Sequence, residues 1–433
     1  MMHGLKIFNA ACKGCVNCIK SCPTEAIRVI DGLVHILPDL CIDCGECLRT
    51  CRKKALGLDE DDWRELLSQK VPVLADPSFF AQFAAWRPDG VPEALEQSGI
   101  RTLNTRRAFD LAALAVARYL EEAPREELPL ISTYCPAVLR LIRIRFPELL
   151  SRTVPVESPL EVSAELWGRD HGGEAPVLLA PCPAKITMVR EPLGRDRSAI
   201  GAAVSIRRVV RDLLSSGVKM HTPQEEALTS RRDLPWALRG GEAEHVRRFA
   251  RRPVRAIAVS GHRNTLDVLR DLELGRLQGV DYVECRFCDL GCIGGVANAE
   301  SRFLAEIRVK TTEVSWELSQ EEREDLEQLH ASGIWRLQKD IKPQNRLPLG
   351  GDFSEAMNQL TRFREVLDQL PHIDCGACGR PSCQAMAEDI VRGNAELTDC
   401  IFKLRERIAS LAGEIEGLSR NVPHTLRTRE KDR

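Results

Sequence analysis

Seventeen cysteines, gathered in a few groups, are the residues of this 433-residue sequence best suited to bind metal. Eight of them form two runs with the same CxxCxxCxxxC spacing. These are Cys12, Cys15, Cys18 and Cys22 in the first run, and Cys41, Cys44, Cys47 and Cys51 in the second. Four closely spaced thiolates are the usual ligand set of a [4Fe-4S] cluster. The spacing therefore predicts two such clusters, with a pair of four-ligand zinc sites as the alternative.

A further group of four cysteines lies near the other end of the sequence. It comprises Cys375, Cys378, Cys383 and Cys400. The last of these follows a segment, residues 384–397, that reads as helix. Gly376 and Gly379 let the backbone fold tightly enough for its amides to approach cluster sulfides. We expect one [4Fe-4S] cluster here, again with zinc as the alternative.

Five cysteines in three segments occupy the middle of the sequence. They are Cys135, Cys182, Cys285, Cys288 and Cys292. Four thiolates suffice for one more [4Fe-4S] cluster. Cys285 is then left over, either as a buried structural thiol or as a proton relay or spare ligand.

Apolar strands and amphipathic helices alternate around these segments, which is typical of an α/β domain. The alternation runs through residues 71–74, 109–120, 128–131, 139–146, 177–179, 204–214 and 256–259. Cys135 and Cys182 each follow a short apolar strand. The loops at the carboxyl ends of strands are where α/β folds commonly build their sites, so this placement suits a buried cofactor.

The two ends of the sequence resemble known iron-sulfur domains. The paired runs are similar to the bacterial two-cluster ferredoxin domain, which implies that Cys51 joins the first cluster and Cys22 the second. Arg52 stands where a proline commonly follows the second run. The group at 375–400 resembles the small [4Fe-4S] domain of Rnf-complex B subunits and corrinoid iron-sulfur proteins.

The three central segments resemble the signature segments of the [FeFe]-hydrogenase catalytic domain. The resemblance implies that a [4Fe-4S] cube is held by Cys135, Cys182, Cys288 and Cys292, and that Cys292 bridges to a diiron subsite, together forming an H-cluster. It also implies that Lys185 hydrogen-bonds a diatomic ligand on iron, where a solvent-facing lysine is the alternative. Ser158, Gly294 and Gly295 would lie close to the cofactor.

Several residues differ from the hydrogenase pattern, mostly where protons and diatomic ligands would be handled. Tyr134 replaces the thiol that relays protons in the enzymes, and Met188 replaces a glutamate of the proton path. The other differences are Leu160, Ala180 and Arg286. A positioned acid or base contributes roughly 100-fold or more to a rate. Any hydrogenase activity is therefore expected to be low.

The resemblances together predict an α/β hydrogenase-like central domain, an N-terminal α+β two-cluster ferredoxin domain and a small, mostly helical C-terminal Fe-S domain. The expected boundaries are 1–57 (ferredoxin domain), 58–310 (hydrogenase-like domain), 311–350 (helical connector), 351–402 (small [4Fe-4S] domain) and 403–433 (short coiled coil and disordered tail). This organisation resembles that of sensory [FeFe]-hydrogenases, in which electrons pass between [4Fe-4S] clusters and a central H-cluster-like site. One alternative is an electron-transfer protein with [4Fe-4S] clusters only, and another is an electron-donating subunit of a different oxidoreductase.

Charge and hydropathy narrow the choice of partners. Lys and Arg number 61 against 63 Asp and Glu, which leaves no basic footprint for nucleic acid. The sequence shows neither a signal peptide nor an apolar run long enough to span a bilayer, so we expect a cytoplasmic protein without membrane insertion. Apolar residues repeat at alternating four and three spacing in 404–418. This seam predicts a homodimer or the docking of a redox or signalling protein, or else packing on its own domain.

Overall fold

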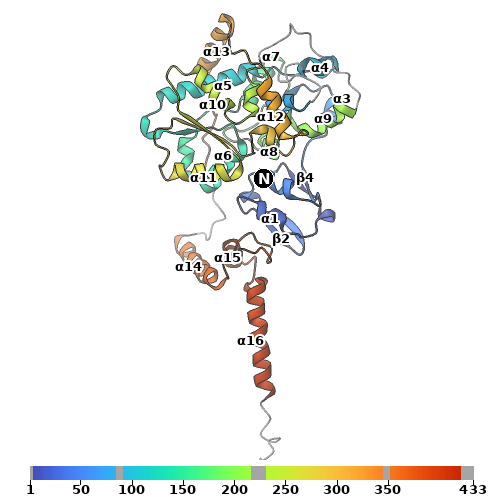
Figure 1. The fold of residues 1–433 in the computed structure, drawn as a ribbon, viewed down its shortest axis with the longest axis vertical. Coiled ribbons are helices and arrows are strands. Elements are labelled where there is room, and N and C mark those ends of the chain that lie inside the picture. Colours follow the sequence, from blue (N-terminus) through green and yellow to red (C-terminus); the bar gives the residue numbers. More distant parts are fainter. Residues whose placement is uncertain (1–2, 84–90, 216–230, 345–351, 421–433) are drawn as a thin grey trace, which may run out of the picture. The chain divides into compact units, whose positions relative to one another are not determined.

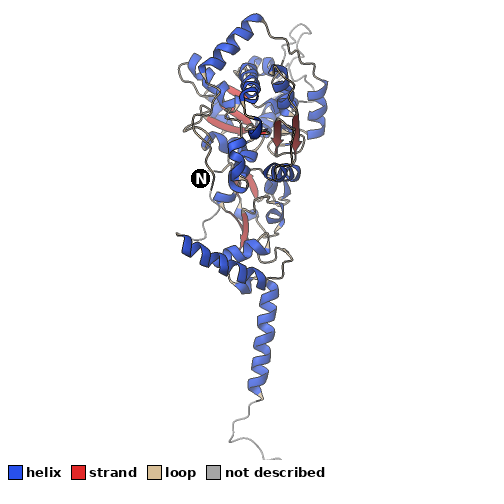
Figure 2. Cartoon of the chain, turned by 90° about the vertical axis from the view of Figure 1, so that its left-hand side faces the viewer, coloured by secondary structure: helices blue, strands red, loops and turns tan. Residues whose placement is uncertain are grey.

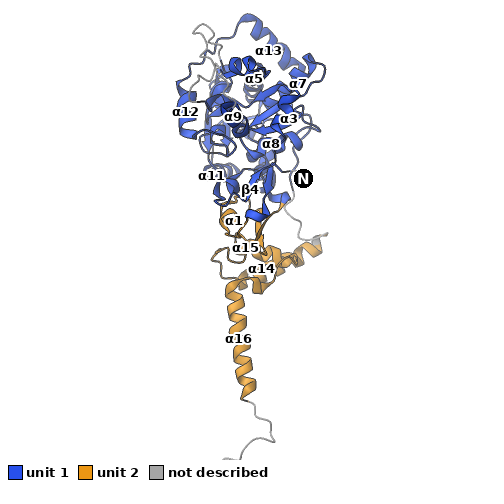
Figure 3. Ribbon diagram, turned by 90° about the vertical axis from the view of Figure 1, so that its right-hand side faces the viewer, with its two compact units in different colours: residues 1–11, 38–346 blue, residues 12–37, 347–433 orange. Residues whose placement is uncertain are grey.

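The computed structural model describes residues 3–83, 91–215, 231–344 and 352–420. The chain divides into two compact units, coloured separately in Figure 3. Unit 1 comprises residues 1–11 and 38–346, and unit 2 comprises residues 12–37 and 347–433. The first cysteine run therefore belongs to unit 2 and the second run to unit 1. The predicted disordered tail and the end of the predicted connector lie outside the described residues.

Two three-stranded parallel sheets form the centre of unit 1. The first has the order β5 (Val73–Ala75), β7 (Val177–Ala180), β8 (Ala202–Ser205), and the second has the order β6 (Leu130–Ile131), β10 (Tyr282–Arg286), β9 (Ala256–Ser260). Every residue of β5, β7 and β10 is buried. Such continuous burial is expected of parallel strands that helices cover on both faces. Figure 2 shows these strands in red inside a shell of helices.

Helices and strands alternate along the chain in unit 1. The helices are α2 (Glu46–Thr50), α3 (Trp63–Ser68), α4 (Val91–Gln97), α5 (Arg106–Glu122), α6 (Pro136–Arg145), α7 (Pro159–Asp170), α8 (Pro183–Arg190), α9 (Ile206–Ser215), α10 (Gly241–Phe249), α11 (His262–Glu273), α12 (Arg302–Thr311) and α13 (Gln320–Ser332). Helix α5 packs against α7, α10 and α13 (Figure 1). It is rich in alanine, and its small side chains let the neighbouring helices approach closely. Its buried face forms much of the main apolar core.

Three of these helices begin with a proline directly after a predicted site residue. Cys135, Ser158 and Cys182 are the N-cap residues of α6, α7 and α8. Proline is favoured at the first helical position because its φ angle is already helical and its missing N–H has no partner there. The two Cys-Pro pairs therefore place their thiols at helix N-termini, just after β6 and β7.

The remaining elements of unit 1 are short. Strand β1 (Leu5–Ile7) pairs with β4 (Leu56–Leu58) in an antiparallel ladder. The short 3-10 helices described in this unit are η1 (Asn9–Ala11), η2 (Pro38–Leu40), η3 (Pro77–Ala81), η5 (Arg125–Glu127), η6 (Pro147–Arg152), η7 (Leu234–Ala237) and η8 (Cys292–Gly294). No helix in the described ranges is long and apolar enough to cross a membrane.

The described residues of unit 2 form a hairpin and four helices. Strands β2 (Ile27–Ile30) and β3 (Leu33–Ile36) pair in an antiparallel ladder, and the turn between them, Asp31-Gly32, has the positive φ angles of 52° and 75° that a two-residue hairpin favours. The helices are α1 (Asn17–Ser21), α14 (Phe353–Gln369), α15 (Cys383–Val391) and α16 (Ile401–Ser419), with the turn η9 (Leu397–Asp399).

Two segments named from the sequence have different bounds in the structure. Residues 204–214 are divided between the end of β8 and helix α9, because residues 204 and 205 continue the ladder with β7. The helix predicted over 384–397 is α15, which ends at Val391. It stops there because Gly393 takes a left-handed φ of 76°.

Candidate iron-sulfur sites

Four of the five central cysteines lie together in unit 1, after the ends of parallel strands. They are Cys135, Cys182, Cys288 and Cys292. Burial raises the pKa of the Cys288 thiol, and the nearby Cys182, Cys135 and Cys292 raise it further. Burial likewise raises the pKa of Cys182, with further contributions from Cys292 and Cys135. Thiols that interact this closely in a buried place suit a metal centre, whose positive charge deprotonates and neutralises them.

The fifth central cysteine, Cys285, lies within β10 and is completely buried. Burial raises the pKa of this thiol, and neighbouring Cys135 raises it further. A thiol that stays protonated behaves as a small apolar side chain. This environment agrees with the interpretation of Cys285 as a structural thiol.

Lys185 is completely buried at the start of α8, so the solvent-facing alternative is wrong. Its ammonium group forms an ion pair with the carboxylate of Asp76 and lies 3.8 Å from the sulfur of Cys292. Burial lowers the pKa of Lys185, but the negative charges of Asp76, Cys292 and Tyr134 together outweigh burial and the net pKa is raised. Lys185 therefore stays charged beside the central thiols.

Asp76 is a site residue that the sequence analysis missed. It follows strand β5 directly, and one carboxylate oxygen accepts hydrogen bonds from the amide (2.9 Å) and the hydroxyl (2.6 Å) of Ser78. The other oxygen binds Lys185 and accepts a hydrogen bond of 3.4 Å from the hydroxyl of Tyr134. The signal in the sequence was an acidic residue directly after a buried apolar strand, at the same sheet edge as Cys182.

Tyr134 and Arg286 occupy the same buried region as Lys185. The ammonium nitrogen of Lys185 lies 4.0 Å from the centroid of the Tyr134 ring, and the guanidinium carbon of Arg286 lies 4.1 Å from it. Both are cation–π distances. Arg286 also pairs with the buried carboxylates of Glu242 (2.9 Å) and Glu284 (3.1 Å). Two of the residues that differ from the hydrogenase pattern, Tyr134 and Arg286, thus pack together with Lys185, Asp76 and two buried glutamates in one charged network.

This network surrounds the sulfur of Cys292. Burial raises the pKa of the Cys292 thiol to about 11, with smaller contributions from Lys185, Asp76 and Arg286. The two cations lower this pKa and the carboxylate raises it. The charge next to the thiolate is therefore mixed rather than simply positive.

Gly294 and Gly295 lie where the backbone approaches itself closely. A β-carbon at Gly294 would lie 2.0 Å from the carbonyl oxygen of Asp289, and one at Gly295 would lie 2.2 Å from that of Pro181. Only glycine fits such contacts. Gly294 therefore lets the Cys292 segment turn back on Asp289, and Gly295 lets it pack against the Cys182 segment.

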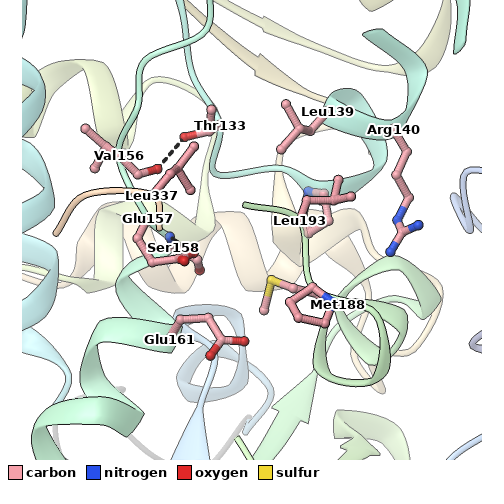
Figure 4. Close-up of a pocket in the computed structure, with 12 residues that line it drawn as sticks. Thr133, Leu139, Arg140, Val156, Glu157, Ser158, Glu161, Met188, Leu193 and Leu337 are labelled. Atoms are coloured by element: carbon pink, nitrogen blue, oxygen red, sulfur yellow. Dashed lines mark hydrogen bonds between the residues drawn. The ribbon is translucent and has the colours of Figure 1, made fainter. Parts of the chain in front are cut away.

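The predicted cofactor residue Ser158 lines a separate cavity, together with Thr133, Met188, Glu157 and Glu161 (Figure 4). No central cysteine is among the residues that line it. The two glutamates are buried, and burial together with the charge of Glu161 raises the pKa of Glu157 to about 7. Arg195 pairs with Glu161 at 3.2 Å and with Glu157 at 3.6 Å.

The second N-terminal run packs directly on the central site within unit 1. Arg49, between Cys47 and Cys51 on α2, donates a hydrogen bond of 2.7 Å to the carbonyl oxygen of Gly294. Gly45, with a φ of 80°, lies so near Val296 that a β-carbon would come within 2.6 Å of it. The amide of Ala55 donates to the sulfur of Cys51 at 3.3 Å. Amide–sulfur bonds of this kind are common around cluster ligands.

The cysteines of the first run lie on helix α1 and on either side of it in unit 2. The amide of Ala26 donates to the sulfur of Cys22 at 3.2 Å, which repeats the Ala55–Cys51 contact of the second run. Val16 and Gly45, the N-cap residues of α1 and α2, both take the left-handed conformation. The two runs are thus alike in local structure as well as in spacing.

The four terminal cysteines all line one cavity of unit 2. Cys383 begins α15, and Cys400 is the N-cap residue of α16. Gly376 and Gly379 both have a φ of 77°, which lets the backbone between the ligands turn sharply. Four thiols around one hollow are the donor set that a [4Fe-4S] cluster requires.

Comparison with protein families agrees with this geometry. Residues 5–52 match the 4Fe-4S dicluster domain, and residues 370–402 match an Fe-S cluster family. Residues 69–296, just over half of the chain, match the family "Iron only hydrogenase large subunit, C-terminal domain". These matches define an iron-sulfur electron-transfer protein with a hydrogenase-like domain, as predicted. The chain belongs to the iron-only hydrogenase large subunit family through its central domain.

Individual curated relatives match short segments of the chain. The B subunit of the ion-translocating oxidoreductase complex of Methanosarcina acetivorans is 40% identical over 52 residues, which are 12% of this chain and 20% of the relative. The polyferredoxin protein MvhB of Methanothermobacter marburgensis is 45% identical over 78 residues, which are 16% of this chain and 19% of the relative. The chain thus spans about a fifth of the length of these curated relatives.

Solved structures of [FeFe]-hydrogenases are similar to the chain over a longer range. A variant of HydA1 from Chlamydomonas reinhardtii superposes with a TM-score of 0.49 at 13% identity, covering 64% of this chain and 95% of that one. An apo variant of the same hydrogenase gives a TM-score of 0.48, also at 13% identity and with the same coverage.

Proposed function

We propose that this protein carries single electrons among four [4Fe-4S] clusters and that its central site holds a plain cube. The central ligands would be Cys135, Cys182, Cys288 and Cys292. Two further clusters would be held by the eight cysteines of the N-terminal runs, and one by the four terminal cysteines. The partly buried, mutually interacting thiols of unit 1 and the four-cysteine cavity of unit 2 support this assignment.

The observation that carries the choice of a plain cube is the packed network beside Cys292. Asp76 engages the ammonium group of Lys185, which would otherwise be directed at a diatomic ligand. The ring of Tyr134 lies against the same ammonium group, and Asp76 adds a buried negative charge. An anionic diiron group with cyanide ligands would meet a carboxylate here instead of a donor, and like charges at short range repel in a buried site. These residues do not fit a diiron subsite.

A low-activity, hydrogenase-like redox or H2 sensor is the second candidate. It is favoured by one contact, the distance of 3.8 Å between the nitrogen of Lys185 and the sulfur of Cys292. In either case a redox or signalling protein would exchange electrons with the chain. We place the protein in the cytoplasm, because seventeen cysteines suit a reducing compartment.

Infrared spectroscopy and iron analysis distinguish the two candidates. We expect protein produced together with the hydrogenase maturation machinery to show no iron-bound cyanide or carbonyl bands and to hold about 16 iron atoms per chain. Replacing both Cys182 and Cys288 by alanine should remove about four of these, and so should replacing both Cys378 and Cys383. Cyanide and carbonyl bands in the wild-type protein would instead establish the sensor with a diiron subsite.

We also propose that helix α16 joins two copies of the chain. Its seam residues are exposed by 40–69%, namely Leu404, Ile408, Leu411, Ile415 and Leu418. Isoleucine at a positions with leucine at d positions favours two-stranded coiled coils. Light scattering should therefore give twice the chain mass of 48.4 kDa. Ile408→Asp should yield the single-chain mass, whereas Ser410→Asp on the other face should leave the dimer intact; a monomeric wild-type protein would contradict the proposal.

A further inference from the structure

The terminal four-cysteine loop of unit 2 packs on the first N-terminal run. The amide of Val29 in β2 donates a hydrogen bond of 2.8 Å to the carbonyl oxygen of Gly379, which follows the ligand Cys378. A β-carbon at Gly379 would lie 1.9 Å from the carbonyl oxygen of Val29. Glycine at this position is therefore required for the hairpin and the loop to meet.

A buried ion pair fixes the same contact. Arg28 donates two hydrogen bonds to Asp389 on α15, one of 2.7 Å from Nε and one of 3.1 Å from Nη2. Both residues are at least 95% buried. Arg380, in the ligand loop, also donates to Asp389 at 3.2 Å. Bidentate pairs of this kind are geometrically specific, so they set the orientation of the two cysteine groups and not only their proximity.

Lys20 connects the two groups of ligands most directly. It stands on α1 between Cys18 and Cys22, and its ammonium group donates to the carbonyl oxygen of Asp374 and, at 3.1 Å, to that of Pro381. Those two carbonyl groups flank the segment that runs from Cys375 toward Cys383. A β-carbon at Gly376 would lie 2.9 Å from Cε of Lys20. One positive charge is thus shared by the ligand segments of both groups.

We infer that the terminal cube exchanges electrons directly with the cube that Cys12, Cys15 and Cys18 help to hold, and that Lys20 is the positioning residue between them. In this step the reduced cube would lose one electron and the other cube would gain it. No bond is formed or broken, and no proton is transferred. A nearby cation stabilises the more negative, reduced form of each cube. Lys20 therefore favours reduction on both sides of the contact.

This inference rests on the proposed function, because it needs cubes at both groups of cysteines. Redox titration followed by electron paramagnetic resonance on the full chain tests it. Lys20→Met should move the midpoint potential of the terminal cube to a more negative value, and Lys20→Arg should restore it. Lys20 is an exposed residue, so its replacement is not expected to unfold the unit, and iron content verifies this.

The matched control is Lys13→Met, which removes a charge between Cys12 and Cys15 on the same run. It should shift the N-terminal cube alone and leave the terminal cube at its wild-type potential. A terminal cube whose potential is unchanged in Lys20→Met would overturn the inference and leave the proposed function standing. A wild-type protein without a terminal cube, seen as about four missing iron atoms, would overturn the proposed function itself.

Discussion

Asp76→Ala is expected to lower the melting temperature of the central domain by roughly 10 °C. The change leaves the ammonium group of Lys185, which is only 1% exposed, without its carboxylate. Removing one partner of a buried ion pair costs about 3–5 kcal/mol. The melting transition can be followed by tryptophan fluorescence, because Trp236 lies against Tyr134 in the same core with ring centroids 5.1 Å apart.

Two variants show whether the loss arises from the unpaired charge. The double variant Asp76→Ala, Lys185→Met removes both charges and should regain most of the lost stability, since an apolar replacement of a buried pair is often neutral. Asp59→Ala breaks a partly exposed pair with Arg190 and should cost at most about 1 kcal/mol. If the single variant melted within about 2 °C of the wild type, the Asp76–Lys185 pair would not be a buried one.

Much of the cluster chemistry could be predicted from the sequence, because ligand spacing is a local property. The repeated CxxCxxCxxxC runs identify eight candidate ligands without any knowledge of the fold. The positions of Cys135 and Cys182 were also predictable, since an apolar run followed by Cys-Pro indicates a strand, a sharp turn and a helix N-terminus. In the structure both residues follow parallel strands and cap helices.

The charged network around Cys292 could not be predicted in the same way. Asp76 and Lys185 are 109 residues apart, and their pairing depends on β5 and β7 being neighbours in one sheet. Hydropathy treats Arg286 as a surface residue, yet it lies inside β10 with Glu242 as its partner. Long-range packing decides which of these charged residues pair, and the pattern of charges along the sequence does not predict it. The predicted end of helix α15 was wrong for a more local reason, because Gly393 takes a left-handed conformation and ends the helix.

Glu157→Gln is expected to stabilise the central domain at alkaline pH, by up to about 3 kcal/mol at pH 8.5. Burial and the charge of Glu161 raise the pKa of Glu157 to about 7 in the folded protein, above its ordinary value of 4.5. The folded state therefore holds a proton that the unfolded state releases, so stability is full below about pH 4.5 and falls as the pH rises through 7. Glutamine keeps the shape of the protonated acid and avoids this loss.

The measurement is the difference in melting temperature between Glu157→Gln and the wild type at several pH values from 6 to 8.5. That difference should grow by roughly 3–6 °C over this range, because about 1.4 kcal/mol of the loss falls between pH 6 and 8.5. The negative charges of Glu161 and Glu165 disfavour the ionised form of Glu157. The guanidinium group of Arg195, 3.6 Å from the Glu157 carboxylate, favours it. The exposed Glu148→Gln serves as the matched control, with a difference that does not change with pH. If the Glu157→Gln difference were also flat from pH 6 to 8.5, Glu157 would be ionised throughout, with Arg195 compensating fully for its burial.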